Sequence, residues 1–335
     1  MRARLVVLAL AALALWWLWP AAPLAARFGL DDCRVLALSD TTTGKPIRGV
    51  EDMALADETL ILSAYDRLSA GRGEAGGLYR LPLAALAEDG PLALTPVAPG
   101  IDHPHGIAAA GGRLAVIART YGANGLEGAA IHILDAKSGA VLWQAVDQCT
   151  ANDLAFAGPW VAVSHDRRHC EGLSWREMLL PAGHARVERL SATESATLAT
   201  ALTFANGIAI GPGAGWRLAV AETRAARLTL DPETPRARRL ALPGAPDNLS
   251  LAPDGRLLAA LHPSLWRLAL HRHGLSARAP SRAVAVDPMT GAVEVLFDDP
   301  GGDLWPGATV AVETPDALVL GAIRAAGVLV CERRA

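Results

Sequence analysis

The sequence has no run of lysine or arginine residues that resembles a nucleic-acid footprint, and its formal net charge is only -3 over 335 residues. Acidic and basic residues are interspersed along the chain, so we do not expect a nucleic-acid partner. The Gly-x-Ser-x-Gly motif is also absent, which argues against a serine hydrolase built on that nucleophile turn.

Charged residues are missing altogether from Leu5 to Ala26, directly after Arg2 and Arg4. A basic start followed by an apolar stretch and small residues is typical of an export signal. The uncharged span is also long enough to cross a bilayer, although two prolines weaken its second half. We therefore predict that residues 1–26 are a signal peptide or signal anchor. The rest of the chain would be exported to a periplasmic or extracellular location, with possible membrane association through this segment.

The sequence contains four cysteines, a number that fits an oxidising compartment and allows three pairings. Pairing Cys33 with Cys331 would join the two ends of the exported region. Cys149 and Cys170 could then form a second, local bridge, or remain buried free thiols.

Helical periodicity is lacking beyond the N-terminal segment; short β-rich runs are instead separated by Gly, Pro, Asp and Asn. Two similar hairpins, at 134–143 and 286–295, belong to a set of related segments that recur about every fifty residues. This period over this length predicts an all-β fold, a six-bladed β-propeller over residues 33–335. A Cys33–Cys331 bridge would clamp the ring, whereas a pair of β-sandwiches would not predict the repeat.

The segment "FANGI" interrupts an apolar run with Asn206-Gly207, which taken alone predicts a hairpin turn. Similar interruptions recur as "VED" at 50–52, "AND" at 151–153 and "PDN" at 246–248. In a propeller the inner strand of each blade begins near the channel mouth, so these polar residues would converge there. The alternative is that each bonds its own backbone in a turn.

Carboxylate and amide oxygens are hard ligands that suit calcium and not zinc or copper. The set that would converge is Glu51, Asn152, Asn206, Asp247 and Asn248. Asp52 and Asp153 follow two of these residues and would point elsewhere on an extended strand, where they could hold a second ion.

Six segments carry a family resemblance when taken together: "GVEDMAL", "HPHGIA", "ANDLAFAG", "LTFANGIAI", "PDNLSL" and "LHPS". Their order and blade-like gaps resemble the paraoxonase/arylesterase family, within a wider group that includes gluconolactonase-like propellers. The resemblance extends from Gly49 to Cys331. It implies a six-bladed propeller with two calcium ions that hydrolyses lactones and aryl esters.

Carried over by motif, the resemblance assigns the converging set to a catalytic calcium. A structural calcium would be held by Asp52, Asp153 and the main-chain oxygen of Ile107. The terminal disulfide between Cys33 and Cys331 and a retained hydrophobic N-terminus also match the family.

The motif "HPHGI" places His105 at the family's general base, ahead of His103, because only the second histidine precedes Gly-Ile. His262 in "LHPS" matches a histidine that lines the family's site, and we assign it to substrate contact. Residues 67–77 match the position of a mobile active-site loop.

One position departs from the family: the partner of the base falls at or beside Arg119, where no histidine stands. This departure puts organophosphate hydrolysis in doubt, whereas a lactonase or esterase is less affected because the metal can polarise the carbonyl. An arginine close to His105 would lower the pKa of the imidazole.

The sequence thus predicts an exported calcium-dependent hydrolase of small lactones or aryl esters, in which His105 activates water. Two alternatives remain: a non-catalytic calcium-stabilised propeller that binds a partner, and a sugar-lactone hydrolase of the same superfamily.

Overall fold

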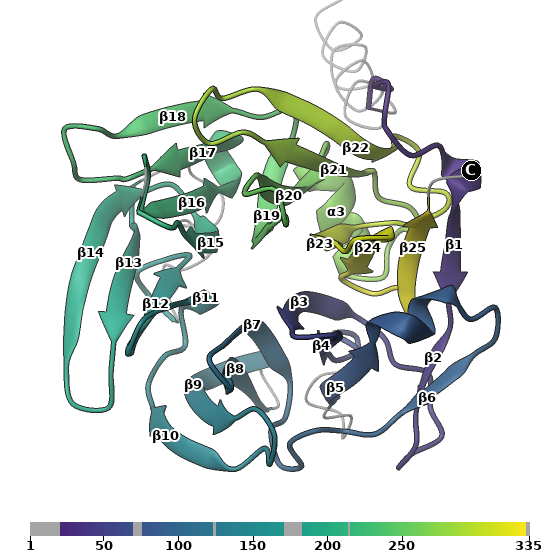
Figure 1. Ribbon diagram of the computed structural model, residues 1–335, viewed down its shortest axis with the longest axis horizontal. Helices are drawn as coiled ribbons and strands as arrows, with labels where there is room; N and C mark the ends of the chain where they lie inside the picture. Colours follow the sequence, from purple (N-terminus) through teal and green to yellow (C-terminus); the bar gives the residue numbers. More distant parts are fainter. Residues whose placement is uncertain (1–20, 70–75, 123–124, 171–182, 214, 333–335) are drawn as a thin grey trace, which may run out of the picture.

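The computed structural model describes residues 21–335 except 70–75, 123–124, 171–182, 214 and 333–335. Its strands form six blades around a central channel (Figure 1), which confirms the predicted all-β propeller. Residues 1–20 of the export segment predicted at 1–26 lie outside the described residues. No helix in the described part of the chain is long and apolar enough to cross a membrane.

The first three blades follow the chain from the inside of the ring to its outside. Blade 1 contains β3 (Val50–Ala56), β4 (Thr59–Ala64) and β5 (Gly77–Pro82), with β2 (Leu38–Asp40) and β6 (Leu92–Leu94) paired in parallel at its edge (Figure 1). Blade 2 contains β7 (Pro104–Ala110), β8 (Arg113–Gly122), β9 (Gly125–Asp135) and β10 (Val141–Ala145). Blade 3 contains β11 (Ala151–Ala157), β12 (Trp160–His165), β13 (Ala185–Leu190) and β14 (Ser195–Leu202).

The next two blades repeat the same order, with short helices in their connections. Blade 4 contains β15 (Ala205–Ile210), β16 (Leu218–Glu222), β17 (Arg227–Leu230) and β18 (Arg238–Ala241). Blade 5 contains β19 (Ala245–Leu251), β20 (Leu257–His262), β21 (Ser281–Val286) and β22 (Val293–Asp299). The helix α3 (Leu265–Arg272) follows β20, and the 3-10 turns are η1 (Leu30–Asp32), η2 (Leu83–Ala87) and η3 (Thr223–Ala225).

Blade 6 closes the ring with strands from both ends of the chain. Its first three strands are β23 (Ala308–Glu313), β24 (Ala317–Ala322) and β25 (Val328–Glu332), and β1 (Cys33–Leu36) completes it. Cys33 lies opposite Cys331 in the antiparallel pair of β1 and β25, and the two are disulfide-linked. The predicted clamp, hereafter the closing disulfide, is therefore confirmed.

Apolar side chains fill the interfaces between neighbouring blades. The described residues form six buried clusters, one for each interface, made mostly of Ala, Val, Leu and Ile from alternate strand positions. Each fully buried Leu or Val contributes about 1.5–3 kcal/mol relative to an exposed one, so these clusters set how adjacent blades pack. The inner strands are consequently held at fixed positions around the channel.

The "FANGI" segment is not a turn, because Asn206 and Gly207 lie within the continuous strand β15. The inner strands of blades 4 and 5 approach closely here: a Cβ on Gly207 would come within 2.5 Å of the carbonyl oxygen of Asp247. Gly106 in β7 has the same role toward blade 3, since its Cβ would lie 2.4 Å from the carbonyl oxygen of Asn152. Glycine is therefore required by close packing of strands around the channel.

The chain before Cys33 also packs on the propeller. The amide groups of Arg27 and Phe28 donate to carbonyl oxygens of β22, and Phe28 is buried in the interface between blades 5 and 6. Arg27 forms ion pairs with Glu294 and Glu313. The ordered unit thus includes residues on the N-terminal side of β1.

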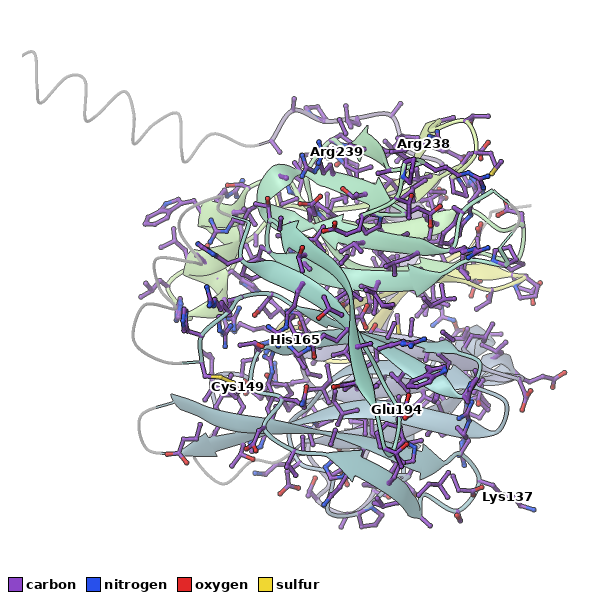
Figure 2. All side chains as sticks on the ribbon, turned by 90° about the vertical axis from the view of Figure 1, so that its left-hand side faces the viewer. Lys137, Cys149, His165, Glu194, Arg238 and Arg239 are labelled. Atoms are coloured by element: carbon purple, nitrogen blue, oxygen red, sulfur yellow. A yellow bond between two sulfur atoms is a disulfide. The ribbon has the colours of Figure 1, made fainter. Side chains whose placement is uncertain are left out.

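All six inner strands, β3, β7, β11, β15, β19 and β23, begin at the same face of the disc, which we call the site face. Figure 2 shows the disc edge-on, with Cys149 toward one face and Lys137 at the other. Cys149 precedes β11 and therefore marks the site face, whereas Lys137 lies in the turn between β9 and β10. The second strand of each blade runs antiparallel to the first, so its end returns to the site face.

Candidate active site

The polar residues predicted to converge all lie at the site-face ends of inner strands and are buried. Two contacts join them across blades. Asn248 Nδ2 donates to the main-chain oxygen of Glu51 at 2.8 Å, linking blades 5 and 1. Asn206 Nδ2 donates to Asp247 Oδ1 at 2.6 Å, linking blades 4 and 5. These contacts pair Asn248 with Glu51 and Asn206 with Asp247, whereas Asn152 lies at the same end of β11 and contacts Asp166 instead.

The amide groups at this site leave acceptor oxygens available. Asn152 Nδ2 donates to Asp166 Oδ2 at 3.3 Å. Asn206 Oδ1 is buried and has no hydrogen-bond partner among the described residues. An orphaned buried acceptor beside carboxylates is costly unless a cation or donor meets it.

His262 contacts a proposed ligand directly. Its Nε2 lies 2.7 Å from Asp247 Oδ2, and both side chains are buried. The imidazole therefore orients the Asp247 carboxylate. Its assignment to substrate contact stays a prediction.

His105 lies beside Glu51 in the same buried cluster. Its Nδ1 is 3.5 Å from Glu51 Oε1 and 3.3 Å from an amino nitrogen of Arg67. Burial, together with the positive charge of Arg119 and other arginines, holds the pKa of His105 well below its usual range. The imidazole is consequently neutral at pH 7, the form that can accept a proton.

Arg119 stands where the family would place the partner histidine of the general base. As predicted from the sequence, its positive charge contributes to lowering the pKa of His105. Its side chain is buried, and its Nε has no hydrogen-bond partner in the described part of the chain.

Three further residues at this site were not found from sequence: Arg67, Tyr65 and Tyr121. Arg67 forms an ion pair with Glu51 and donates to the hydroxyl of Tyr65, which lies 2.9 Å from the hydroxyl of Tyr121. Burial opposes ionisation of Tyr121, but the charges of Arg119 and Arg67 outweigh it and lower its pKa. Arg67 begins the segment 67–77, of which 70–75 lie outside the described residues.

Asp52 and Asp153 each accept a hydrogen bond from an amide group of the neighbouring blade. Asp52 accepts from the amide groups of Met53 and Ile107, at 2.8 and 2.7 Å. Asp153 accepts in the same way from Leu154 and Ile208, both at 2.7 Å. The structure shows the amide of Ile107 in this contact, and a role for its carbonyl oxygen stays a prediction.

Burial raises the pKa of both carboxyl groups. For Asp52 the nearby charge of Asp153 adds to the effect, and for Asp153 the result is a pKa of about 8. Buried acids that repel one another in this way are compatible with a bound cation, which would relieve the repulsion.

The donor set fits a hard divalent cation in chemistry, with carboxylates and amide oxygens in one buried cluster. Within the described ranges, however, no three His, Cys, Asp or Glu side chains are grouped as a metal site. The fit therefore depends on Asn152, Asn206 and Asn248 together with Glu51 and Asp247.

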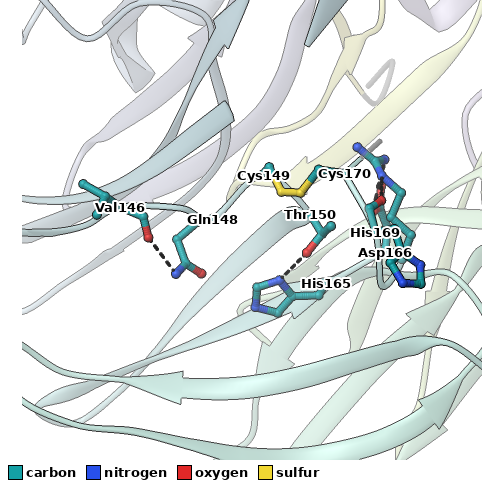
Figure 3. The surroundings of a disulfide bond; sticks show 9 residues. Val146, Gln148, Cys149, Thr150, His165, Asp166, His169 and Cys170 are labelled. Atoms are coloured by element: carbon teal, nitrogen blue, oxygen red, sulfur yellow. Dashed lines mark hydrogen bonds and ion pairs between the residues drawn. A yellow bond between two sulfur atoms is a disulfide. The ribbon is translucent and has the colours of Figure 1, made fainter. Parts of the chain in front are cut away.

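A second disulfide, Cys149–Cys170, brackets part of this site (Figure 3). Cys149 directly precedes Thr150, whose hydroxyl lies 2.9 Å from His165 Nδ1. Cys170 follows the segment that carries Asp166, the partner of Asn152. This local disulfide thus ties the start of β11 to the chain beyond β12, and the open choice between a bridge and free thiols is settled as a bridge.

Comparison with known proteins identifies the fold. No protein-family model matches the chain, and no curated protein matches its sequence. The structure is similar to a gluconolactonase from Xanthomonas campestris, with 17% identity, a TM-score of 0.54, and coverage of 93% of this chain and 96% of that one. It is also similar to a protein provisionally described as a gluconolactonase, with 16% identity, a TM-score of 0.52, and coverage of 93% and 94%. These neighbours establish the six-bladed propeller fold; the paraoxonase resemblance remains an inference from motifs.

Proposed function

We propose that this protein is a calcium-dependent hydrolase of lactones, with aryl esters as a second substrate class. The observation that carries the proposal is the neutral, buried His105 beside Glu51, at the end of the channel where hard oxygen donors converge. The gluconolactonase names of the two structural neighbours support a cyclic ester as substrate.

The ligand oxygens for a catalytic ion would come from Glu51, Asn152, Asn206, Asp247 and Asn248, and Asp52 and Asp153 would serve a second, structural ion. Calcium at the first position would polarise the carbonyl of a lactone or ester. His105 would take a proton from the attacking water. The surrounding arginines disfavour the imidazolium, so His105 would release that proton readily afterwards.

A panel of aliphatic lactones, sugar lactones and phenyl esters, assayed with and without a calcium chelator, tests the activity. His105→Gln should lower turnover by about 10²–10⁴-fold with calcium binding preserved, because general-base catalysis typically contributes that much. His132→Gln, on β9 in the body of blade 2, is the matched control. Normal turnover in His105→Gln would remove the histidine from the mechanism.

The two calcium positions can be separated by mutation. Asn206→Ala should abolish turnover and leave the fold intact, because it removes a neutral ligand of the proposed catalytic ion. Asp153→Ala should lower the melting temperature instead, since a metal bound only by the folded state adds stability by mass action. Calorimetric calcium titration and thermal melts distinguish the two. Identical melting and full activity in both variants would contradict the two-ion assignment.

A non-catalytic calcium-stabilised propeller is the second candidate, and the arginine at position 119 favours it, because a histidine that would partner the general base is missing there. A folded protein that binds calcium but hydrolyses nothing in the panel would support this candidate.

We also propose that the protein is exported, because two disulfides in the structure fit an oxidising compartment and the N-terminal sequence fits a leader. Fractionation of cells that express the full chain tests this, and recovery of reduced protein in the cytosol would contradict it.

A further inference from the structure

Each blade places an arginine at the site-face end of its second strand, or in the segment that follows it. These six residues, hereafter the arginine ring, are Arg67, Arg119, Arg167, Arg224, Arg272 and Arg324. Their spacing along the chain is about one blade, so the position recurs in the repeat as the inner-strand polar residues do. The ring therefore surrounds the same end of the channel as His105.

Two members of the ring have a carboxylate partner among the described residues. Arg67 pairs with Glu51, and Arg167 pairs with Asp166 at 3.2 Å. Arg324 donates to a main-chain oxygen at 2.6 Å, and Arg224 lies over the ring of Phe204.

Arg119 and Arg272 form no ion pair within the described ranges. Arg119 is buried, and its Nε is left without a partner there. Arg272 is exposed at the last residue of α3. Arg119 is held near His105, because its amide group donates to the main-chain oxygen of His103 at 3.2 Å. Arg272 follows His271, whose main-chain oxygen accepts from Arg324 at 2.6 Å.

A buried guanidinium without an anion is expensive, because its desolvation is not repaid by a partner. The planar fork of arginine matches carboxylate and phosphate oxygens, often through two parallel hydrogen bonds. Arg67 donates to the hydroxyl of Tyr65, which lies 2.9 Å from the hydroxyl of Tyr121, and Tyr121 lies two residues after Arg119 on β8. An anionic group on a bound molecule would satisfy this arrangement, whereas a neutral lactone would leave Arg119 unpaired.

We propose that the arginine ring selects substrates that carry a carboxylate or phosphate group on the lactone or ester scaffold, with Arg119 as the direct contact. The lactone or ester scaffold in this inference rests on the proposed function. Recognition of the anionic group is separate from hydrolysis and is tested by binding.

Calorimetry with ketone analogues that cannot be hydrolysed tests the binding. Cyclopentanone carboxylate and cyclopentanone phosphonate should each bind about 10- to 100-fold more tightly than cyclopentanone carboxamide, a range typical of charge-assisted hydrogen bonds. The relative affinity of the carboxylate and the phosphonate shows which of these two anions the arginine ring prefers. The titrations are run with calcium and with chelator, so that binding to a metal is separated from binding to arginine.

Variants locate the contact. Arg119→Gln should reduce the preference for anion over carboxamide about 10-fold or more, and Arg119→Lys should retain part of it. Arg113→Gln is the matched control, since Arg113 lies on the same strand at the opposite face. If Arg119→Gln does not fold, Arg272→Gln should show a smaller loss of the same preference, because Arg272 is exposed.

Equal binding of the carboxylate, phosphonate and carboxamide by the wild type would overturn the inference, as would an unchanged preference in both Arg119→Gln and Arg272→Gln. Preferential anion binding without hydrolysis of any lactone would refute the proposed function and leave the inference standing. Hydrolysis of neutral lactones together with equal binding of the three ketones would support the proposed function and refute the inference about anion recognition.

Discussion

Gly207→Ala tests whether close strand packing builds the site. An ideal Cβ at this position would meet three main-chain atoms: the oxygen of Asp247 and the nitrogen of Leu249, both at 2.5 Å, and the carbonyl carbon of Asn248 at 2.7 Å. Main-chain atoms cannot rotate away as the end of a side chain can. Strand β19 must therefore move away from β15, and two proposed calcium ligands move with it.

The expected cost follows from these contacts. Adding a methyl group to a tightly packed interior typically costs about 1–3 kcal/mol. Replacing glycine also restricts the unfolded chain, which returns about 0.4–1 kcal/mol. We expect Gly207→Ala to lower the free energy of unfolding by about 1–2 kcal/mol, and to weaken calcium binding because Asp247 and Asn248 are displaced.

Urea unfolding measures the stability, and calorimetric titration measures the calcium affinity. Gly128→Ala is the matched control, because Gly128 also lies in a strand, β9, and a Cβ there meets no atom within 4 Å. Gly207→Ala that is as stable as Gly128→Ala, with calcium affinity equal to the wild type, would refute the packing argument.

Two further predictions concern stability. Replacing both cysteines of the closing disulfide with serine should cost more than the same change in the local disulfide, because the bridged residues are 298 and 21 positions apart. The loop-entropy model gives about 6 and about 3 kcal/mol, and equal losses in urea unfolding would argue against it. The imidazole of His165, whose Nε2 lies 3.4 Å from Glu188 Oε2, and the guanidinium of Arg186 hold the pKa of Glu188 at about 2, below the ordinary value of 4.5. Its ionised form therefore stabilises the fold above pH 4.5, and this contribution is lost as pH falls toward 2. Glu188→Gln should flatten that part of the stability-against-pH curve, and an unchanged acid limb would exclude the contact as a contributor.

The propeller could be predicted because each blade repeats short sequence patterns that favour strands and turns locally. The hairpins at 134–143 and 286–295 correspond to β9–β10 and β21–β22, each joining the outer strands of a blade. Turn chemistry at Asp135 and Asp287 fixes these hairpins, since each carboxylate accepts amide groups from the turn that follows it. Such signals need only a few neighbouring residues, so they survive in a single sequence.

Asn206-Gly207 shows where local signals fail. Its hairpin preference is real for an isolated segment, but the packing of β15 against β19 overrides it. Only the neighbouring blade, about forty residues away in sequence, explains why this position must lack a side chain. Tertiary contacts of this kind have no local signature.

The repeat also made part of the candidate site predictable. Inner-strand ends share one register in the repeat, so Glu51, Asn206 and Asp247 could be placed together before their contacts were known. Pairings within the cluster, such as Asn206 with Asp247, depend on side-chain packing and could not be predicted.

The arginine ring lies at a second offset in the same repeat, at the ends of the second strands. A propeller returns those ends to the face where the inner strands begin, because the two strands of each pair are antiparallel. One repeat therefore brings two chemically opposite sets of residues to one face: acceptor oxygens on the inner strands and guanidinium groups after the second strands. Arg67 joins the two sets directly, because it forms an ion pair with Glu51. Both sets must be considered together when the specificity of the channel is derived from its sequence.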